Sequence, residues 1–144
     1  MTIREILVFA IAMAVRAIRP GLYFLWIDEL NTLNAAADIA YQGQWSWVGN
    51  PANWDGLAYH SPVTNYAMTL PMFLSNDPTV ARLFMAILSA LTVVVSMRLM
   101  QRYTDSSTAL IAGLFIAVLP QLVEWGRFVW NPSFAPLFIM LWIF

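Results

Sequence analysis

Charge is scarce in this sequence, and several residue types are missing or nearly so. The chain has no cysteine and no lysine, a single histidine, and charged side chains at only 10% of its 144 positions. Without cysteine there is no disulfide framework, no thiolate metal site and no thiol nucleophile. One histidine, His60, excludes a multi-histidine metal site. No basic tail or patch is present to recruit nucleic acid.

Apolar side chains, in contrast, occupy 60% of the positions. An average soluble domain carries roughly 25% charged residues, so this composition predicts an integral membrane protein. Uncharged runs cover residues 83–97, 106–123 and 128–144. We predict an all-α, polytopic membrane protein with about four transmembrane helices and a large first extracytoplasmic loop that carries short amphipathic helices. The spans lie at roughly 5–24, 78–100, 106–124 and 130–144, the last one truncated, and the loop at roughly 25–77.

The first span is the least well bounded. Its uncharged run, residues 6–15, is shorter than the roughly 20 residues that a span usually needs. Arg16 and Arg19 must therefore snorkel or lie at the far interface. A cleaved signal peptide is the alternative, because the run has the length of an h-region and Ala-Met-Ala at 12–14 has the small-x-small pattern. That cleavage site would fall inside the apolar run, which favours the span.

Two adjacent carboxylates, Asp28 and Glu29, follow this span. From Asp28 to about residue 42 the pattern is helical, and Gly43 is a natural stop. The predicted apolar face of this helix comprises Leu30, Leu33, Ala37 and Ala40. Asp28 can simply cap the helix, with Glu29 as a favourable charge in the first turn. Capping and catalysis are compatible, because a capping carboxylate is already fixed in position.

The loop after Gly43 is rich in aromatic side chains, namely Trp45, Trp47, Trp54 and Tyr59. These rings either form a belt at headgroup level or stack on a ligand. Ser61 and Pro62 then indicate a helix start. The stripe that follows comprises Val63, Tyr66, Ala67, Leu70 and Leu74, and Pro71 interrupts it. This pattern predicts a short kinked helix that lies on or dips into the membrane.

Arginines gather on one side of the predicted topology. If the amino terminus is cytoplasmic, four of the seven arginines lie outside, against the positive-inside rule. They converge there with Asp28, Glu29, His60 and most of the tryptophans, which suggests a binding site for something anionic. An ionisable group at a membrane boundary, such as Arg82, is a functional candidate, although it can also be a snorkelling interfacial arginine. The outer arginines are Arg16, Arg19, Arg82 and Arg127.

In order and spacing, these features resemble the N-terminal part of a GT-C glycosyltransferase of the kind related to protein O-mannosyltransferases and aminoarabinose transferases. The resemblance covers nearly the whole chain and makes it part of a single GT-C-like transmembrane domain. Ser61 and Gly126 depart from the family pattern, which carries a proline and a serine there. The matching positions are Arg16, Asp28-Glu29, Gly43, His60-Ser61-Pro62, Arg82-Leu83, and Gly126-Arg127 with Asn131.

The resemblance implies transfer of a hexose or pentose from a polyprenyl-phosphate donor to a hydroxyl acceptor, which is a protein, lipid or glycan. The transfer takes place on the extracytoplasmic face of an inner or plasma membrane, and it inverts the anomeric carbon without a covalent intermediate. Such chemistry needs a base for the acceptor proton and cations for the leaving phosphate. We expect Asp28 as the base and Glu29 as the residue that orients the acceptor or pairs with an arginine.

The candidate groups for lipid phosphate or substrate are Arg16, Arg82, Arg127, His60 and Asn131, because a guanidinium fork matches phosphate oxygens. His60 at a loop-to-helix junction can equally be structural. We expect no required cofactor, although Asp28 and Glu29 could also hold a divalent cation weakly.

Two other functions compete with the enzyme reading. The first is a small, non-catalytic multi-span protein that acts as a scaffold or partner subunit. The second is a transporter fragment, although no internal repeat is found here. Because the chain stops inside an apolar run, we expect it to be the front piece of a longer enzyme and inactive by itself.

Overall fold

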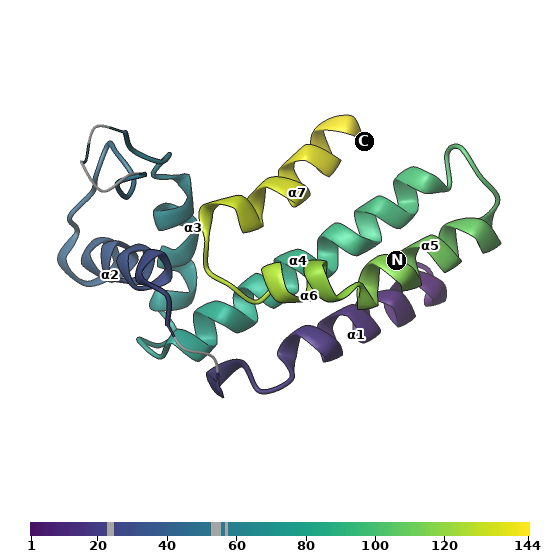
Figure 1. The fold of residues 1–144 in the computed structure, drawn as a ribbon, viewed down its shortest axis with the longest axis horizontal. Coiled ribbons are helices and arrows are strands. Elements are labelled where there is room, and N and C mark those ends of the chain that lie inside the picture. The colour runs from purple at the N-terminus through teal and green to yellow at the C-terminus, as the bar shows by residue number, and fades with distance from the viewer. Residues whose placement is uncertain (23–24, 53–55, 57) are drawn as a thin grey trace.

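A computed structural model describes residues 1–22, 25–52, 56 and 58–144 of the chain. In this part the fold is all-helical, as predicted, with seven α-helices, one 3₁₀ helix and no strand beyond an isolated bridge between Pro51 and Tyr59. The long helix α4 (Pro78–Met100) is the element on which the others are assembled (Figure 1). The helices that pack on it are α1 (Ile3–Ala17), α3 (Val63–Met72), α5 (Ser106–Val118) and α7 (Asn131–Ile143).

Helix α4 begins with strong local signals. Asp77 is its N-cap, and its carboxylate accepts a hydrogen bond of 2.8 Å from the backbone N–H of Thr79. That bond holds the pKa of Asp77 below its usual value. Pro78 fills the first helical position, where its missing N–H costs nothing. The helix coincides with the predicted span 78–100, and among the described residues it alone is long and apolar enough to cross a membrane.

Alanines contribute much of the buried interface of α1, α4 and α5, together with two valines and Met97, whereas several large apolar side chains of α1 and α5 point outward. The buried cluster is made of Val8, Ala12, Ala90, Val93, Met97, Ala109 and Ala117. Ile6, Leu7, Ile111 and Phe115 are exposed. This distribution is typical of helices in lipid, where small residues allow close packing and large ones meet acyl chains.

The first predicted span is shorter as a helix than expected. Helix α1 begins at a capping box between Thr2 and Glu5 and ends at Ala17. Its 15 residues cover about 22 Å, less than the roughly 30 Å of a bilayer core. Arg19 then adopts a left-handed φ of 49°, and the 3₁₀ helix η1 (Pro20–Leu22) follows.

The third predicted span is two helices. Helix α5 ends at Val118, Leu119 is extended, and α6 (Pro120–Trp125) begins at the proline. The predicted kink at Pro120 is therefore a break, with Leu119 in the extended region that a following proline favours.

Helices α2 (Ile27–Gln42) and α3 pack on each other. The predicted apolar face of α2 is confirmed in part, because Leu33 is buried and Ala37 and Ala40 pack against the core, whereas Leu30 is exposed. The buried residues of α2 are Glu29, Thr32, Leu33, Ala36 and Ile39. On α3, the predicted stripe is largely exposed, with Leu74 just beyond its end at 82%. The buried residues of α3 are Thr64, Asn65, Met68, Thr69, Pro71 and Met72.

The connection from α2 to α3 is held by backbone pairing. Gly43 ends α2 in a left-handed conformation, as its position in the sequence predicted. His60 accepts a hydrogen bond from Gly49 N–H and donates one to the Asn50 carbonyl, each 2.9 Å long. Trp45, whose ring lies 5.4 Å from that of Tyr66, and Trp47 are exposed, and Trp54 lies outside the described residues. The choice between an aromatic belt and a ligand platform for these rings stays a prediction.

Candidate functional site

A pocket of about 620 Å³ lies between the start of α2 and the segment that joins α5 to α7. Three carboxylates and several aromatic rings face it. Because the two walls are about 100 residues apart in the sequence, only the folded chain forms this pocket. Its lining comprises Trp26, Asp28 and Glu29 on one wall, and Gln121, Glu124, Trp125, Phe128, Val129 and Trp130 on the other.

The start of α2 sets the first wall. The helix begins at Ile27 with Trp26 as N-cap and no side-chain cap, so Asp28 and Glu29 are its second and third residues. Asp28 is thus not the capping residue that the sequence suggested. Both acids still lie in the first turn, where the helix dipole favours negative charge. Successive helical residues point about 100° apart, so Glu29 turns inward and Asp28 stays at the surface.

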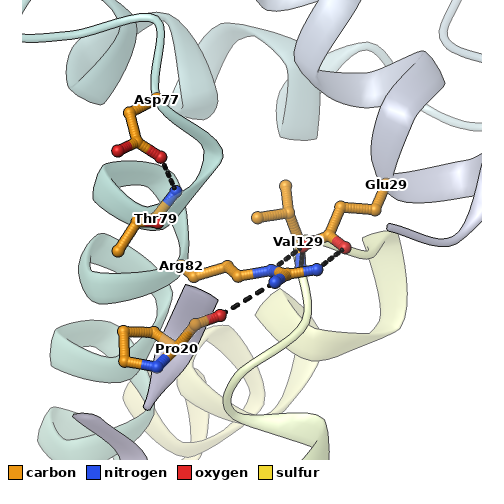
Figure 2. A network of polar contacts seen from close by, with 6 residues as sticks. All are labelled: Pro20, Glu29, Asp77, Thr79, Arg82 and Val129. Carbon is orange, nitrogen blue, oxygen red and sulfur yellow. Dashed lines mark hydrogen bonds and ion pairs between the residues drawn. The ribbon is translucent and has the colours of Figure 1, made fainter. Parts of the chain in front are cut away.

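Glu29 is locked in a buried ion pair. Its Oε1 accepts a hydrogen bond of 2.8 Å from Arg82 Nε, and its Oε2 one of 2.6 Å from Arg82 Nη2 (Figure 2). The side chains of Arg82 and Glu29 are 4% and 1% exposed. Arg82 Nη1 also donates to the Pro20 carbonyl at 2.8 Å, and the Val129 N–H approaches Glu29 Oε1 at 3.4 Å. This one pair therefore ties together the start of α2, η1, α4 and the segment before α7.

The Asp28 side chain differs from that of Glu29 in both exposure and partners. Its side chain is exposed and lines the pocket. Within the described residues its carboxylate has no hydrogen-bond or ion-pair partner, although its backbone carbonyl accepts from Thr32. Lone pairs of this carboxylate are therefore available to a substrate, whereas both oxygens of Glu29 are engaged.

Arg16 is buried behind the second wall. Its Nε donates to Ser89 Oγ at 2.8 Å, and Nη1 donates to the carbonyls of Ala12 and Ala117 at 3.1 and 2.7 Å. A longer contact of 3.5 Å joins Nη2 to the Leu122 carbonyl. The break at Pro120 removes helical donors from carbonyls at the end of α5, and Arg16 supplies one to Ala117. The Leu122 carbonyl on the other side of the break also accepts from the Gly126 N–H.

The other predicted phosphate ligands are not part of the described pocket lining. Arg127 is half-buried, and its Nη2 donates to the Val15 carbonyl. His60 is also half-buried, at the backbone pairing before α3. The side chain of Asn131 lies outside the described residues. The pocket thus brings together Asp28 and Glu29, with Arg82 behind them, but its lining does not include Arg16, Arg127 or His60.

Several residues that line the pocket were not predicted as site residues. Glu124 and Trp125, on the short helix α6, face it, and so do Trp26, Gln121 and Trp130. The sequence does contain a signal for Glu124 and Trp125, because an acid beside a tryptophan at the end of an apolar run marks an ionisable group at a membrane boundary. In the sequence analysis these residues serve only as the end of the third span.

No cluster of three or more metal-ligating side chains occurs in the residues that the structure describes. A cation at the predicted weak site of Asp28 and Glu29 would have to compete with Arg82 for the Glu29 carboxylate. The Arg82 guanidinium already binds both oxygens of that carboxylate.

Comparison with known proteins identifies the family. The family profile of the dolichyl-phosphate-mannose-protein mannosyltransferases matches residues 59–144, more than half of the chain. The matched segment contains Arg82, Glu124 and Arg127 and begins after the Asp28-Glu29 pair. No curated protein and no solved structure gives a significant match. The chain belongs to the dolichyl-phosphate-mannose-protein mannosyltransferase family, which consists of membrane-integral glycosyltransferases of the GT-C type.

Proposed function

We propose that the pocket is the sugar-transfer site of a membrane glycosyltransferase and that Asp28 is its base. The enzyme moves a hexose or pentose from a polyprenyl-phosphate donor to a hydroxyl acceptor with inversion. The observation that carries this proposal is the contrast between the two adjacent acids. Asp28 is exposed in an aromatic pocket without a partner among the described residues, whereas Glu29 is buried and doubly bonded to Arg82.

The proposed step is a single displacement. The acceptor hydroxyl gives its proton to the Asp28 carboxylate, and its oxygen forms a bond to the anomeric carbon. The bond from that carbon to the phosphate oxygen breaks, and its electron pair leaves with the polyprenyl phosphate. The products are the glycosylated acceptor, the free carrier phosphate and protonated Asp28. A positioned base of this kind contributes roughly 10²–10⁴ in rate.

Glu29 and Arg82 have a positioning role in this scheme. Their bidentate pair holds the first turn of α2 against α4, and Asp28 is one residue away from that anchor. Groups that act in catalysis need their geometry fixed within about 0.5 Å by supporting contacts. The pair gives Asp28 such support without itself exchanging protons.

The phosphate clamp by Arg16, Arg82 and Arg127 stays a prediction. Each guanidinium donates to carbonyl or carboxylate oxygens in the structure. A carrier phosphate would therefore have to displace one of these partners or contact a nitrogen that they leave open. Direct contact of His60 or Asn131 with substrate also stays a prediction, and so does transfer without a required cofactor.

We propose a multi-pass topology with the pocket on the extracytoplasmic face of an inner or plasma membrane. Helix α4 has the length and composition of a span. Support for further spans comes from α1 and α5, which expose large apolar side chains around an alanine-rich interface. The exposed apolar stripe of α3 supports a position against lipid, where such a face is stable.

The test is Asp28→Asn in the full-length protein, assayed for sugar transfer in membranes. The change keeps the size of the side chain and removes its basicity, so we expect transfer to fall by about 10²–10⁴. Asp38→Asn is the matched control, because Asp38 is on the same helix and outside the pocket lining.

Wild-type turnover by correctly inserted Asp28→Asn protein would refute the base assignment. If the wild-type protein itself transfers no sugar from any polyprenyl-phosphate donor, the chain acts instead as a scaffold or partner subunit.

A further inference from the structure

A polar network reaches the turn of Asp28 from the loop that follows α2. Thr32 Oγ1 donates a hydrogen bond of 2.8 Å to the Asp28 carbonyl, and Asn50 Nδ2 donates one of 2.8 Å to Thr32 Oγ1. Thr32 is 1% exposed, and Asn50 is half-buried. Two hydrogen bonds in series therefore join the loop to the backbone of the proposed base.

The Thr32 hydroxyl has a partner that other helical hydroxyls lack. An amide nitrogen can only donate, so the hydroxyl oxygen accepts from Asn50 and its single proton goes to the Asp28 carbonyl. Hydrogen bonds in such a series polarise and strengthen one another. Thr69 and Thr92 also donate to the carbonyl four residues earlier, but neither accepts from a side chain in the part of the chain that the structure describes. Thr32 therefore does more than satisfy its own hydroxyl.

The loop end of this network is itself fixed. The Asn50 carbonyl accepts from His60 N–H, and Gly49 N–H donates to the His60 carbonyl, each at 2.9 Å. A Cβ at Gly49 would lie 2.6 Å from that carbonyl oxygen, so the close pairing requires glycine there. Nearer the start of the loop, the Ser46 carbonyl accepts from the Tyr66 hydroxyl of α3. Asn50 thus belongs to backbone that is held at two places.

We propose that Thr32 and Asn50 are positioning residues for the Asp28 base. The inference rests on the proposed transfer function and deepens it by naming a second anchor of the base. The pair of Glu29 and Arg82 holds the first turn of α2 from the side of α4, and the Asn50–Thr32 network holds it from the loop. A misplacement of about 1 Å can cost about 10²-fold in rate, so loss of either anchor lowers kcat.

The experiment measures sugar transfer from a polyprenyl-phosphate hexose in membranes that contain the full-length protein. We expect kcat to fall about tenfold in Thr32→Val, which keeps the shape and loses the hydroxyl, and about threefold in Asn50→Ala. KM should stay unchanged, because neither side chain is in the described pocket lining. Thr32→Ser keeps the hydroxyl and should restore kcat to within about twofold of wild type.

The matched control is Thr69→Val. Thr69 is 5% exposed, and its hydroxyl donates to the Asn65 carbonyl at 3.0 Å, so the change removes the same kind of bond from a buried helix face away from the base. We expect Thr69→Val to keep the wild-type kcat. A second measurement adds Thr32→Val to Asp28→Asn, where it should lower the residual rate no further, because Thr32 acts only through the Asp28 carboxylate.

The outcomes separate the two proposals. Unchanged kcat in Thr32→Val and Asn50→Ala, with Asp28→Asn inactive, overturns the positioning role and leaves the proposed function standing. Equal losses in Thr32→Val and Thr69→Val also overturn it, because the effect would then be one of general stability. If Thr32→Val does not fold, Asn50→Ala decides, since its side chain is only half-buried. Wild-type turnover by Asp28→Asn refutes the proposed base, and this inference with it.

Discussion

The buried pair of Glu29 and Arg82 allows a quantitative test of how the site is held. We consider three variants, Glu29→Gln, Arg82→Met and the double change. Each single variant leaves one buried group without its partner. Glu29→Gln leaves a guanidinium that is 4% exposed, and Arg82→Met leaves a carboxylate that is 1% exposed. Removing one partner of a buried ion pair costs about 3–5 kcal/mol in free energy of unfolding.

The double variant has no buried charge to leave unpaired. Its losses are the two bonds between the side chains and the bond from Arg82 to the Pro20 carbonyl, which at about 0.5–1.5 kcal/mol each are partly offset by the apolar methionine. We therefore expect the double variant to be more stable than either single variant. The coupling between the two changes should exceed about 2 kcal/mol.

The assay is thermal unfolding of the full-length protein in detergent. At roughly 2–4 °C for each kcal/mol, the single variants should lower the midpoint by about 6–20 °C, and the double variant by less. If the decreases in midpoint were additive, so that the double variant unfolded at a lower temperature than both single variants, the reasoning that the two groups act as one buried unit would be refuted. A midpoint unchanged by Glu29→Gln would refute the burial itself.

Two further predictions concern packing and metal dependence. A Cβ at Gly126 would lie 2.2 Å from Ser89 Oγ and 2.7 Å from Ser89 Cβ, so Gly126→Ala should cost about 1–3 kcal/mol by overpacking. The same unfolding assay measures this loss, and a midpoint that Gly126→Ala leaves unchanged would contradict the contact. We also expect transfer to continue after dialysis against a chelator, since Glu29 is held by Arg82 rather than open to a cation; activity restored only by added Mg²⁺ or Mn²⁺ would contradict this.

The elements of the fold were largely readable from the sequence. Asp77 and Pro78 gave an N-cap and a first-turn proline, and α4 follows them as predicted. Gly43 ends α2 as predicted, because glycine adopts the left-handed conformation of a helix end without a Cβ clash. These are local rules, and each one depends on a few neighbouring residues.

The inward face of α3 was not readable in the same way. The sequence predicts an apolar stripe through Leu70 and Leu74 at the membrane, and both side chains are exposed, whereas the side that packs on the protein buries Met68 and Met72 together with polar residues such as Asn65 and Thr69. Thr69 satisfies its hydroxyl on the carbonyl of Asn65, so that polar face can pack inward. Periodicity locates a stripe, and it does not say whether protein or lipid covers it.

The sequence located one wall of the candidate pocket and missed the other. The Asp28-Glu29 pair was found from its place in the chain, and pairing of Glu29 with an arginine was one of the roles considered for it. The opposite wall, with Glu124 and Trp125, depends on the break at Pro120 and on contacts about 100 residues apart, which no local pattern contains. Arg16 was assigned to phosphate because its carbonyl partners could not be seen in the sequence.

The position of Arg16 has a consequence for how the protein is made. Its two carbonyl partners at the α5–α6 break lie 101 and 106 residues further along the chain. At roughly 5–20 residues per second, a ribosome needs about 5–20 s to reach them. During that interval the guanidinium needs other acceptors, and water or lipid phosphates at the membrane surface provide them. Docking of the α5–α6 break then exchanges those temporary partners for the Ala117 and Leu122 carbonyls, and this exchange places the wall of the pocket.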